Sequence, residues 1–427
     1  MTASIDPMPP VAVGLSMPWD ALVEDPIAAI GAARTAYGDT FVVDSAGDPY
    51  LFTFDPVGVR SFYRLPEVAA SKGVADWRML RRKMPDEIFD DRRVLPHALF
   101  ARDDVTNYLH NLQLALAEEL GQLGDSGELD VFVLARRLGH RLGLRSWGGP
   151  AAAADRDFDA LVTAFDALDG SEAFVRPDVT AALSASDKRT ERAALTSITE
   201  IIGATVDGFD DQAGHPLFAR VVAAWRDEPN DVARVGVARD VALIHIASMS
   251  NLFAALGWAL IDLLAHPDYV ERILAGDQAL ADSAALESTR LAQRSLMARY
   301  AVAPTQLETS AGTIAVAAGV TIATLLPLLN TTAAPGLTEW EPERWRRWRL
   351  ADTSALATDE LVTAFGHGKH SCPAQPFSLA AMTAATATIL RNLTLTPHWN
   401  ERPQPEPAQI GGVARAASAC VVTYARN

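Results

Sequence analysis

Phe365-Gly366-His367-Gly368-Lys369-His370-Ser371-Cys372 is the stretch of this 427-residue chain that says most about its fold. An apolar run from Phe377 to Leu390, typical of a helix, follows it. Glycines let the backbone turn tightly and direct N–H groups at one point, and the positive end of a following helix favours a thiolate. Because the thiolate is the form of cysteine that binds metals, the stretch predicts a metal-ligating Cys372. The plain alternative is an ordinary strand-to-helix turn that contains a lone cysteine.

The stretch resembles the cysteine loop of the cytochrome P450 superfamily, which has the pattern F-G-x-G-x-H-x-C-x-G. Every specified position matches except the last, where Ala374 replaces the glycine. The resemblance implies that Cys372 ligates the iron of haem b, which is iron protoporphyrin IX. The other residues that it assigns to the cofactor are Phe365, Gly366, Gly368 and His370, the last of them through a propionate.

Composition restricts the class of protein. A formal net charge of −16 argues against a nucleic-acid partner, and 49% hydrophobic with 21% charged residues is ordinary for a globular protein. Only two cysteines occur, which excludes a disulfide framework and fits a reducing cytoplasm. The first 18 residues lack a basic region, and no stretch has the roughly twenty uninterrupted apolar residues of a membrane span. We therefore expect a cytoplasmic protein without signal peptide or membrane anchor.

The hydrophobic periodicity predicts a protein that is mainly α-helical with small β regions. A helical body is expected from 103 to about 395, around a helix at 231–264 that is too apolar for a surface position. No alternating strand–helix pattern occurs, and the resemblance implies the cytochrome P450 fold, as one domain at 26–427 after a tail at 1–25. Around the body the expected elements are helices at 26–37 and 56–64, a hairpin of 40–43 with 50–53, a long loop at 65–102 and a late hairpin of 313–316 with 320–323.

Glu287 and Arg290 lie one turn apart on a predicted helix. Such a pair is usually a solvated surface pair, but here it stands between the long apolar helix and the cysteine loop, and Arg344 follows within Glu341–Trp345. This order resembles the ExxR helix and the PERF segment of the superfamily. The resemblance implies a buried triad of Glu287, Arg290 and Arg344 behind the haem, for which planar guanidinium groups are well suited.

Arg299 stands nine positions after Arg290. An arginine here pairs with a haem propionate in many members of the superfamily, so the resemblance implies that role, and a surface arginine is the alternative. A second propionate ligand is expected on an early helix. The choice stays open between His97, Arg102 and His110.

The middle of the long helix departs from the superfamily pattern. An acid and a threonine that relay protons usually stand where this chain has Ser250 and Asn251, and Ser248 replaces a glycine. Neither Ser250 nor Asn251 titrates near neutral pH, so acid–base catalysis by these side chains is not expected. Asn251 still donates and accepts hydrogen bonds, and it is the predicted contact to a distal oxygen or to the substrate.

Three functions follow from this departure. The first is a haem-thiolate monooxygenase that delivers protons by another route, and the second is a haem-thiolate isomerase or dehydratase that needs no external reductant. The third is a non-catalytic P450-like partner protein, which the presence of Cys372 disfavours. The sequence of Ala247–Trp258 resembles the branch of the superfamily that contains sterol hydroxylases and prostacyclin synthase. That branch includes both monooxygenases and enzymes that rearrange their substrate, so the resemblance does not decide between the first two functions. No arginine lies between Val241 and Leu256, which disfavours a peroxide-using fatty-acid enzyme.

The expected pocket lies between the long helix and the segment after Arg290. Its apolar lining predicts a lipophilic substrate such as a terpenoid, polyketide or steroid-like molecule, in secondary metabolism. Arg294 is the one charged candidate, as an anchor for an acidic substrate. The pocket residues implied by position are Leu243, Ile246, Ala247, Leu296, Met297 and Arg294.

A basic segment stands before the cysteine loop. Four arginines alternate with Trp345 and Trp348 between Arg344 and Arg349, on a chain that is otherwise acidic. Complementary charge steers protein encounters, so we expect an acidic ferredoxin, with its reductase, to dock here rather than a nucleic acid.

Overall fold

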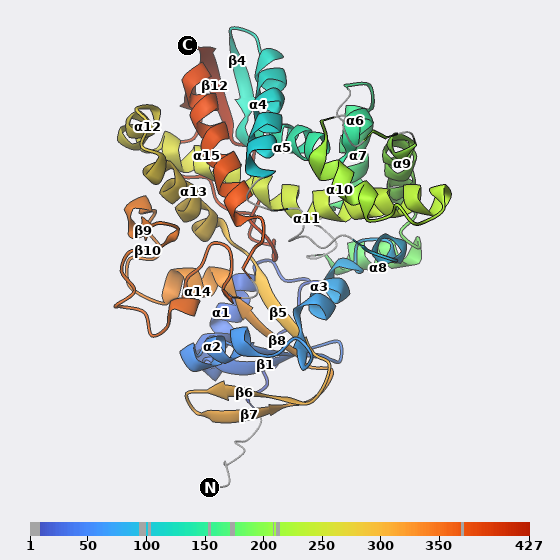
Figure 1. Cartoon of the computed structure of the whole chain (residues 1–427). Coiled ribbons are helices and arrows are strands. Elements are labelled where there is room, and N and C mark those ends of the chain that lie inside the picture. Colours follow the sequence, from blue (N-terminus) through green and yellow to red (C-terminus); the bar gives the residue numbers. More distant parts are fainter. Residues whose placement is uncertain are drawn as a thin grey trace.

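The computed structural model describes residues 9–93, 100, 104–152, 155–170, 176–207, 209–210, 214–368 and 371–427. The protein is mainly helical and has two parts (Figure 1). A β-rich part lies at the bottom of the view, and a larger helical part lies above it around the long helix α11 (Asn230–Leu264). The expectation of a mainly α-helical protein with small β regions is confirmed.

The β-rich part is built on a five-stranded sheet of order β1-β2-β8-β5-β3. Strands β2 and β8 are parallel and the other neighbours are antiparallel. Phe41, Phe52 and Phe54 stack on one another in its core, and helices pack against the sheet. The strands are β1 (Thr40–Ser45), β2 (Asp48–Thr53), β3 (Ala70–Ser71), β5 (Leu296–Ala301) and β8 (Thr321–Leu325), and the helices are α1 (Pro26–Tyr37), α2 (Pro56–Arg64) and α14 (Leu326–Thr332).

Helices α1 and α2 begin and end where the sequence predicts. Each starts with a proline directly after an aspartate, and the side chains of Asp25 and Asp55 accept backbone N–H groups of the first turn. Proline at the first helical position and aspartate at the N-cap are both favoured, because the first N–H groups have no partner within the helix. Local chemistry alone therefore sets these boundaries.

Residues 9–25 are not a free tail. Val11 forms a β-bridge with Val42, and Met17 and Trp19 are almost fully buried in the core of the β-rich part. The indole ring of Trp19 packs against Tyr50. The described end of the chain is therefore part of the folded unit, which corrects the expected boundary at residue 26.

Two further expectations are wrong. The late hairpin of 313–316 with 320–323 does not form, because β7 (Gly312–Val316) pairs with β6 (Thr305–Thr309) and β8 joins the main sheet. All five residues of β8 are buried, and such a strand is placed by its tertiary neighbours rather than by the nearest turn. The segment 65–102 also contains regular structure, namely β3 and α3 (Lys72–Leu80), which is capped by the hydroxyl of Ser71.

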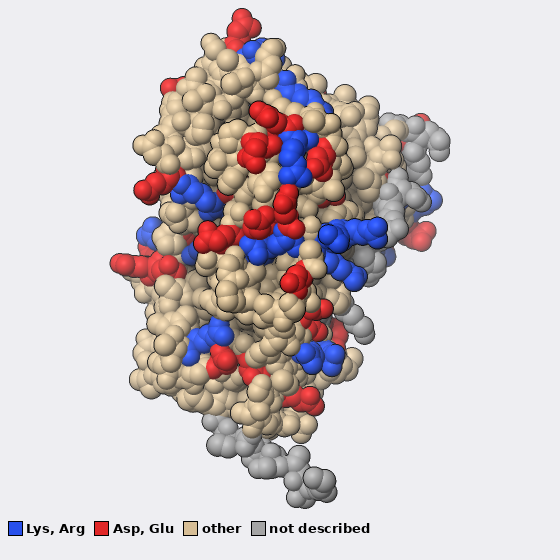
Figure 2. Space-filling view, turned by 90° about the vertical axis from the view of Figure 1, so that its left-hand side faces the viewer, with Lys and Arg blue, Asp and Glu red and all other residues tan. Residues whose placement is uncertain are grey.

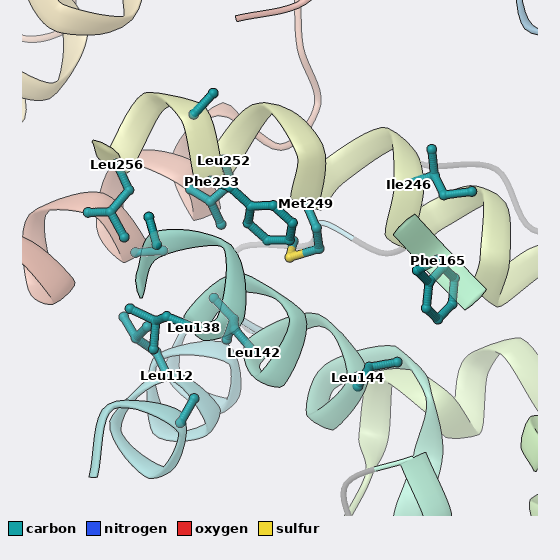
Figure 3. Packing of buried hydrophobic residues seen from close by; sticks show 14 of the residues in the cluster. Leu112, Leu138, Leu142, Leu144, Phe165, Ile246, Met249, Leu252, Phe253 and Leu256 are labelled. Atoms are coloured by element: carbon teal, nitrogen blue, oxygen red, sulfur yellow. The ribbon is translucent and has the colours of Figure 1, made fainter. Parts of the chain in front are cut away.

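The helical part surrounds α11. Helix α5 (Val131–Trp147) packs against it closely, since Gly139 has no side chain where the ring of Phe253 approaches. In Figure 3, Leu138 and Leu142 of α5 lie on the side of α5 that faces Met249, Leu252 and Phe253 of α11, whereas Leu144 lies apart from them. The remaining elements are α4 (Val105–Gly121), α6 (Gly149–Ala152), α7 (Asp155–Leu168), α8 (Pro177–Ala185), α9 (Arg189–Val206), α10 (Pro216–Ala223), α12 (Pro267–Leu274), α13 (Gln278–Ala292), α15 (Gln375–Asn392), β4 (Ser126–Asp130), β9 (Trp345–Arg346), β10 (Arg349–Leu350), β11 (Leu393–Pro397) and β12 (Val421–Arg426).

The position of helix α11 in the fold explains why its sequence is apolar on every side. It is long and hydrophobic enough to cross a membrane, but 78% of its most apolar window is buried inside the protein. A helix that is apolar all round is typical either of a membrane span or of a protein core. The burial assigns α11 to the core.

Candidate functional site

The cysteine loop connects the β-rich part to α15. Its two glycines have left-handed backbone conformations, with φ of 77° at Gly366 and 57° at Gly368, which side chains rarely permit. The turn closes through the N–H of Cys372, which donates to the carbonyl oxygen of Phe365 at 2.8 Å. The glycines therefore have the conformational role that the sequence predicts.

The thiol of Cys372 lies at the beginning of α15. Burial raises its pKa and outweighs the backbone N–H groups of Ala374 and Gln375 and the positive charge of Lys72, which act in the opposite direction. Gln375 is the first residue of α15, so these N–H groups belong to the positive end of that helix. The loop thus places a half-buried sulfur at the positive end of a helix, where backbone dipoles favour the thiolate and burial opposes it.

Ala374 departs from the superfamily pattern without backbone strain. Its φ of −84° and ψ of 0° lie in the right-handed region that any residue adopts. A glycine is therefore not needed here for conformation.

Glu287 is the centre of a buried ion-pair network. Its carboxylate accepts two hydrogen bonds from Arg290, at 2.9 and 2.7 Å, and one from Arg344 at 2.7 Å. The indole N–H of Trp345 donates to it at 2.8 Å. Burial alone would raise the pKa of Glu287, but hydrogen bonds and charge from Arg290, then Arg344 and Trp345, outweigh it and lower that pKa. The structure thus brings together the three residues of the triad.

Asn330 connects this network to the cysteine loop. Arg290 donates to the carbonyl oxygen of Asn330, and the Asn330 amide donates to the carbonyl oxygens of Arg290 and Thr363. Its amide oxygen accepts the Thr363 N–H at 2.8 Å, and Gln293 donates to the carbonyl oxygen of Ala364 at 2.8 Å. Hydrogen bonds therefore connect helix α13 to the residues directly before the loop.

Arg299 lies on β5 and is almost fully buried. Its guanidinium group donates to the carbonyl oxygens of Ala70 and Leu65, at 2.6 and 2.7 Å for one nitrogen. In this arrangement Arg299 fastens the segment before α3 to the sheet. Lys72, which acts on the Cys372 thiol, is the first residue of α3 and directly follows β3.

Helix α11 is open on one side near its middle. Ala247 and Asn251, one turn apart, are exposed, whereas Met249 and Leu252 are buried. Ser250 is half-buried, and the hydroxyl of Ser248 donates to the carbonyl oxygen of Ile244 at 2.5 Å. Of the predicted polar contacts on this helix, Asn251 is the one most accessible.

The predicted pocket residues divide into three groups. Leu243 and Ile246 are buried in the core beside α5, whereas Ala247 is exposed, and Leu296 and Met297 are half-buried on β5. Leu243 is four residues before Ala247 and so lies on the same face of the helix as Ala247 and Asn251, but it is buried where they are exposed. The opening is therefore lined by fewer of the predicted residues than expected.

Arg294, predicted as an anchor for an acidic substrate, is engaged with the C-terminal loop, and its role toward a substrate stays a prediction. Its guanidinium group donates to the carbonyl oxygens of Gln409 and Pro407, both at 2.7 Å. Asp25 lies 3.7 Å from it. The side chain therefore holds the C-terminal loop against the start of β5.

The basic segment forms the small hairpin β9–β10. Arg347 and Trp348 at its tip both have positive φ, of 49° and 67°, and Trp348 is 41% exposed. In the part of the chain that the structure describes, Arg346, Arg347 and Arg349 form no ion pair. A cavity of about 640 Å³ separates the hairpin from the cysteine loop, and Arg347, Arg349 and Phe365 are among its lining residues.

Several predicted residues lie outside the described part of the chain. These are His370, which was assigned to a propionate, and the early candidates His97 and Arg102. His110 lies exposed on α4, which carries no lysine or arginine. No group of three or more His, Cys, Asp and Glu side chains is arranged to hold a metal ion within the described ranges.

Sequence reasoning missed a buried pair of histidines. His140 on α5 and His245 on α11 are hydrogen-bonded at 2.9 Å, and His140 also contacts Asp166 of α7 at 3.1 Å. The two histidines are far apart in sequence, so their contact could not be predicted from neighbouring residues. The only signal was the position of His245 inside an apolar helix, which indicates that this side chain is buried.

Comparisons with known proteins agree with this architecture. The crystal structure of CYP175A1 from Thermus thermophilus matches with a TM-score of 0.68 and 18% identity, over 94% of this chain and 95% of that one. The cytochrome P450 monooxygenase ataF of Aspergillus terreus is 28% identical over 193 residues. That match spans 39% of this chain and only 40% of the relative. No protein-family model matches the sequence.

The protein has the cytochrome P450 fold. The structural match covers nearly the whole chain, so the fold that the cysteine loop suggested is confirmed. At 18% identity the likeness establishes the fold and leaves the chemistry to be inferred from the site.

Proposed function

We propose that the protein is a haem-thiolate enzyme that oxidises a lipophilic small molecule as a monooxygenase. The observation that carries the proposal is the sulfur of Cys372 at the start of α15, where N–H groups of Ala374 and Gln375 stabilise its charge. The donor set fits iron protoporphyrin IX, because a single thiolate at a helix N-terminus suits an axial ligand.

In this proposal each residue near the loop has a defined task. Cys372 would provide the axial sulfur, Gly366 and Gly368 would keep the backbone close, and Phe365 would pack beside the porphyrin. Arg299 and His370 would bind the propionates. The bound haem would supply dioxygen activation, which a thiolate ligand favours by promoting O–O cleavage. The network of Glu287 would keep the loop in place from behind.

The spectrum of the carbon monoxide complex tests this proposal. We expect the reduced, haem-loaded protein to show the red-shifted Soret band of a thiolate-ligated haem. Cys372→Ser should abolish this band, whereas Cys420→Ala, which removes the other cysteine, should keep it. A wild-type protein that binds haem without the shifted band would contradict thiolate ligation, and a protein that binds no haem would support a non-catalytic role.

A second candidate is a haem-thiolate isomerase or dehydratase. Ser250 and Asn251 favour it, because neither side chain titrates near neutral pH and dioxygen activation consumes protons. Product formed under anaerobic conditions without an electron donor would identify this chemistry. A strict requirement for dioxygen and reductant would identify the monooxygenase.

For the monooxygenase we propose an acidic ferredoxin as electron donor and the hairpin β9–β10 as its docking site. Three arginines there form no ion pair within the described residues, and arginine and tryptophan are frequent at the centres of interfaces. Figure 2 shows that the side of the molecule with this hairpin carries basic and acidic side chains in neighbouring clusters. The attraction would therefore be local, next to the loop of Cys372, which is where electrons must arrive.

The substrate class rests on the apolar character of the expected pocket. A terpenoid, polyketide or steroid-like molecule of secondary metabolism, converted in the cytoplasm, agrees with a lining that includes Ala247, Leu296 and Met297. Spectral titration with members of each class would measure this preference.

A further inference from the structure

The side chain of Asn251 has one fixed orientation. Its amide oxygen accepts the backbone N–H of Val413 at 2.8 Å, over a separation of 162 residues. A backbone N–H only donates, so the opposite orientation would place two donors against each other. The amide nitrogen of Asn251, with two N–H bonds, has no hydrogen-bond partner among the described residues.

The loop that supplies Val413 is itself held firmly. The N–H of Gly411 donates to the carbonyl oxygen of Arg294 at 2.7 Å, and the N–H of Arg294 donates back to Gly412 at 2.8 Å. On the other side the indole N–H of Trp258, from α11, donates to the carbonyl oxygen of Ala414 at 2.7 Å. The position of Val413 is therefore set independently of Asn251.

Gly412 permits this contact. A Cβ atom at that position would lie 2.6 Å from the amide oxygen of Asn251, and the φ of Gly412 is 65°. Only glycine therefore allows the loop to pass this close to α11 in this conformation. Gly412 and Val413 together form a clamp on the Asn251 side chain. The clamp fixes which end of the Asn251 amide faces the open side of the helix.

On the open side of α11, the amide of Asn251 presents a hydrogen-bond donor and no acceptor. Asn251 is exposed beside Ala247, while its oxygen is engaged with Val413. The hydroxyl of Ser248, on the preceding turn, donates to the helix backbone. The accessible polar group of Asn251 is thus the N–H₂.

We propose that Asn251 is a specificity-determining donor, which binds a ligand through an acceptor oxygen such as that of a ketone, ether or peroxide. The inference deepens the proposed function and rests on it, because it takes the open side of α11 as the ligand site. It narrows the lipophilic substrates to those with an oxygen acceptor near the reacting region. It also excludes this amide as an acceptor for a substrate hydroxyl.

Two variants separate the clamp from the donor. Asn251→Asp keeps an oxygen for the N–H of Val413 and removes the N–H₂ group, whereas Asn251→Leu removes both. Hydrogen exchange at the Val413 amide is expected to stay slow in the wild type and in Asn251→Asp, and to become faster in Asn251→Leu. Equal exchange in all three proteins would overturn the clamp.

The donor is tested with cyclododecanone and cyclododecane, which differ by one acceptor oxygen, by titration of the haem-loaded protein. Wild type should bind the ketone more tightly than the hydrocarbon. Asn251→Asp, assayed at pH 8, should lose about 2- to 10-fold in ketone affinity, as for one hydrogen bond, with the hydrocarbon unchanged. Asn230→Asp, the same change at an exposed asparagine at the start of α11, is the matched control and should behave as wild type. An unchanged ratio of the two affinities in Asn251→Asp would overturn the proposal, whereas failure of the proposed function would appear earlier, as absence of the thiolate band.

Discussion

His245 on α11 donates to His140 on α5 across a distance of 2.9 Å, and the tautomers of both rings follow from the contact to Asp166. The carboxylate of Asp166 only accepts, so Nε2 of His140 carries a hydrogen and its Nδ1 is the acceptor. Nε2 of His245 must then be the donor, and its Nδ1 carries a buried lone pair that has no hydrogen-bond partner among the residues that the structure describes. Both rings are neutral in this arrangement.

This pair should make the protein less stable in mild acid. Burial lowers the pKa of both histidines, and Arg136 acts in the same direction on both. The unfolded chain binds protons as the pH falls through about 6.5 and the folded chain does not, so the free energy of unfolding falls below that pH, by up to ~1.4 kcal/mol per histidine and pH unit. Urea denaturation between pH 8 and pH 5 measures the slope.

The control for this prediction is an exposed histidine. His245→Leu should flatten the slope between pH 6.5 and 5, whereas His398→Gln, at a 40% exposed site, should leave it unchanged. Burial raises the pKa of Asp166, but hydrogen bonds from His140 and Arg136 lower it overall, so its contribution to stability is lost only below about pH 4. The same slope in the wild type and in His245→Leu would contradict the assignment.

Glu287, in a buried ion pair, should be far more important for stability than Glu343, which forms an exposed ion pair. Glu287→Gln leaves the buried guanidinium of Arg290 without its counter-charge, and breaking a buried ion pair typically costs about 3–5 kcal/mol. Glu343→Gln removes an exposed ion pair with Arg272 and should cost less than about 1 kcal/mol. Chemical denaturation measures both. Similar losses in the two variants would show that the network does not support the fold.

Ala374→Gly and Gly368→Ala should both lower stability, but for different physical reasons. Ala374→Gly adds freedom to the unfolded chain at a right-handed position and should lower stability by about 0.5–1 kcal/mol, without a change in the haem spectrum. Gly368→Ala forces a side chain into a left-handed position that has open space around it, so the cost of about 1–2 kcal/mol is backbone strain alone. A stabilised Ala374→Gly variant would mean that the superfamily glycine has a conformational role here too.

The sequence predicts what local chemistry determines. The bounds of α1 and α2 follow from Asp-Pro pairs, and the turn of the cysteine loop follows from Gly366 and Gly368. These features need only neighbours within a few residues, so their signals are complete in the sequence.

Contacts between distant segments could not be predicted in the same way. Strand β8 pairs with β2 rather than with the adjacent β7, and Arg294 binds carbonyl oxygens more than 110 residues away. Asn251 could be singled out from its place in the long helix, but the partner of its oxygen depends on where a loop 162 residues later is packed. Such contacts are decided by tertiary packing, which residue types alone do not specify.

The hairpin β9–β10 gives the last prediction, which concerns the electron donor. Reversal of charge at Arg347 places an acid where an acidic ferredoxin would approach, so electron transfer at low ionic strength should slow by roughly 10-fold through a lower association rate. The matched control is Arg189→Glu, an exposed arginine at the start of α9, which lies on the opposite side of the molecule (Figure 1). Both variants change the net charge by the same amount. A difference between their electron-transfer rates therefore reflects where on the surface the charge was reversed. The deficit of Arg347→Glu should shrink as salt is added, since screening weakens the attraction that is lost. Equal rates in the two variants at every salt concentration would exclude this face as the docking site.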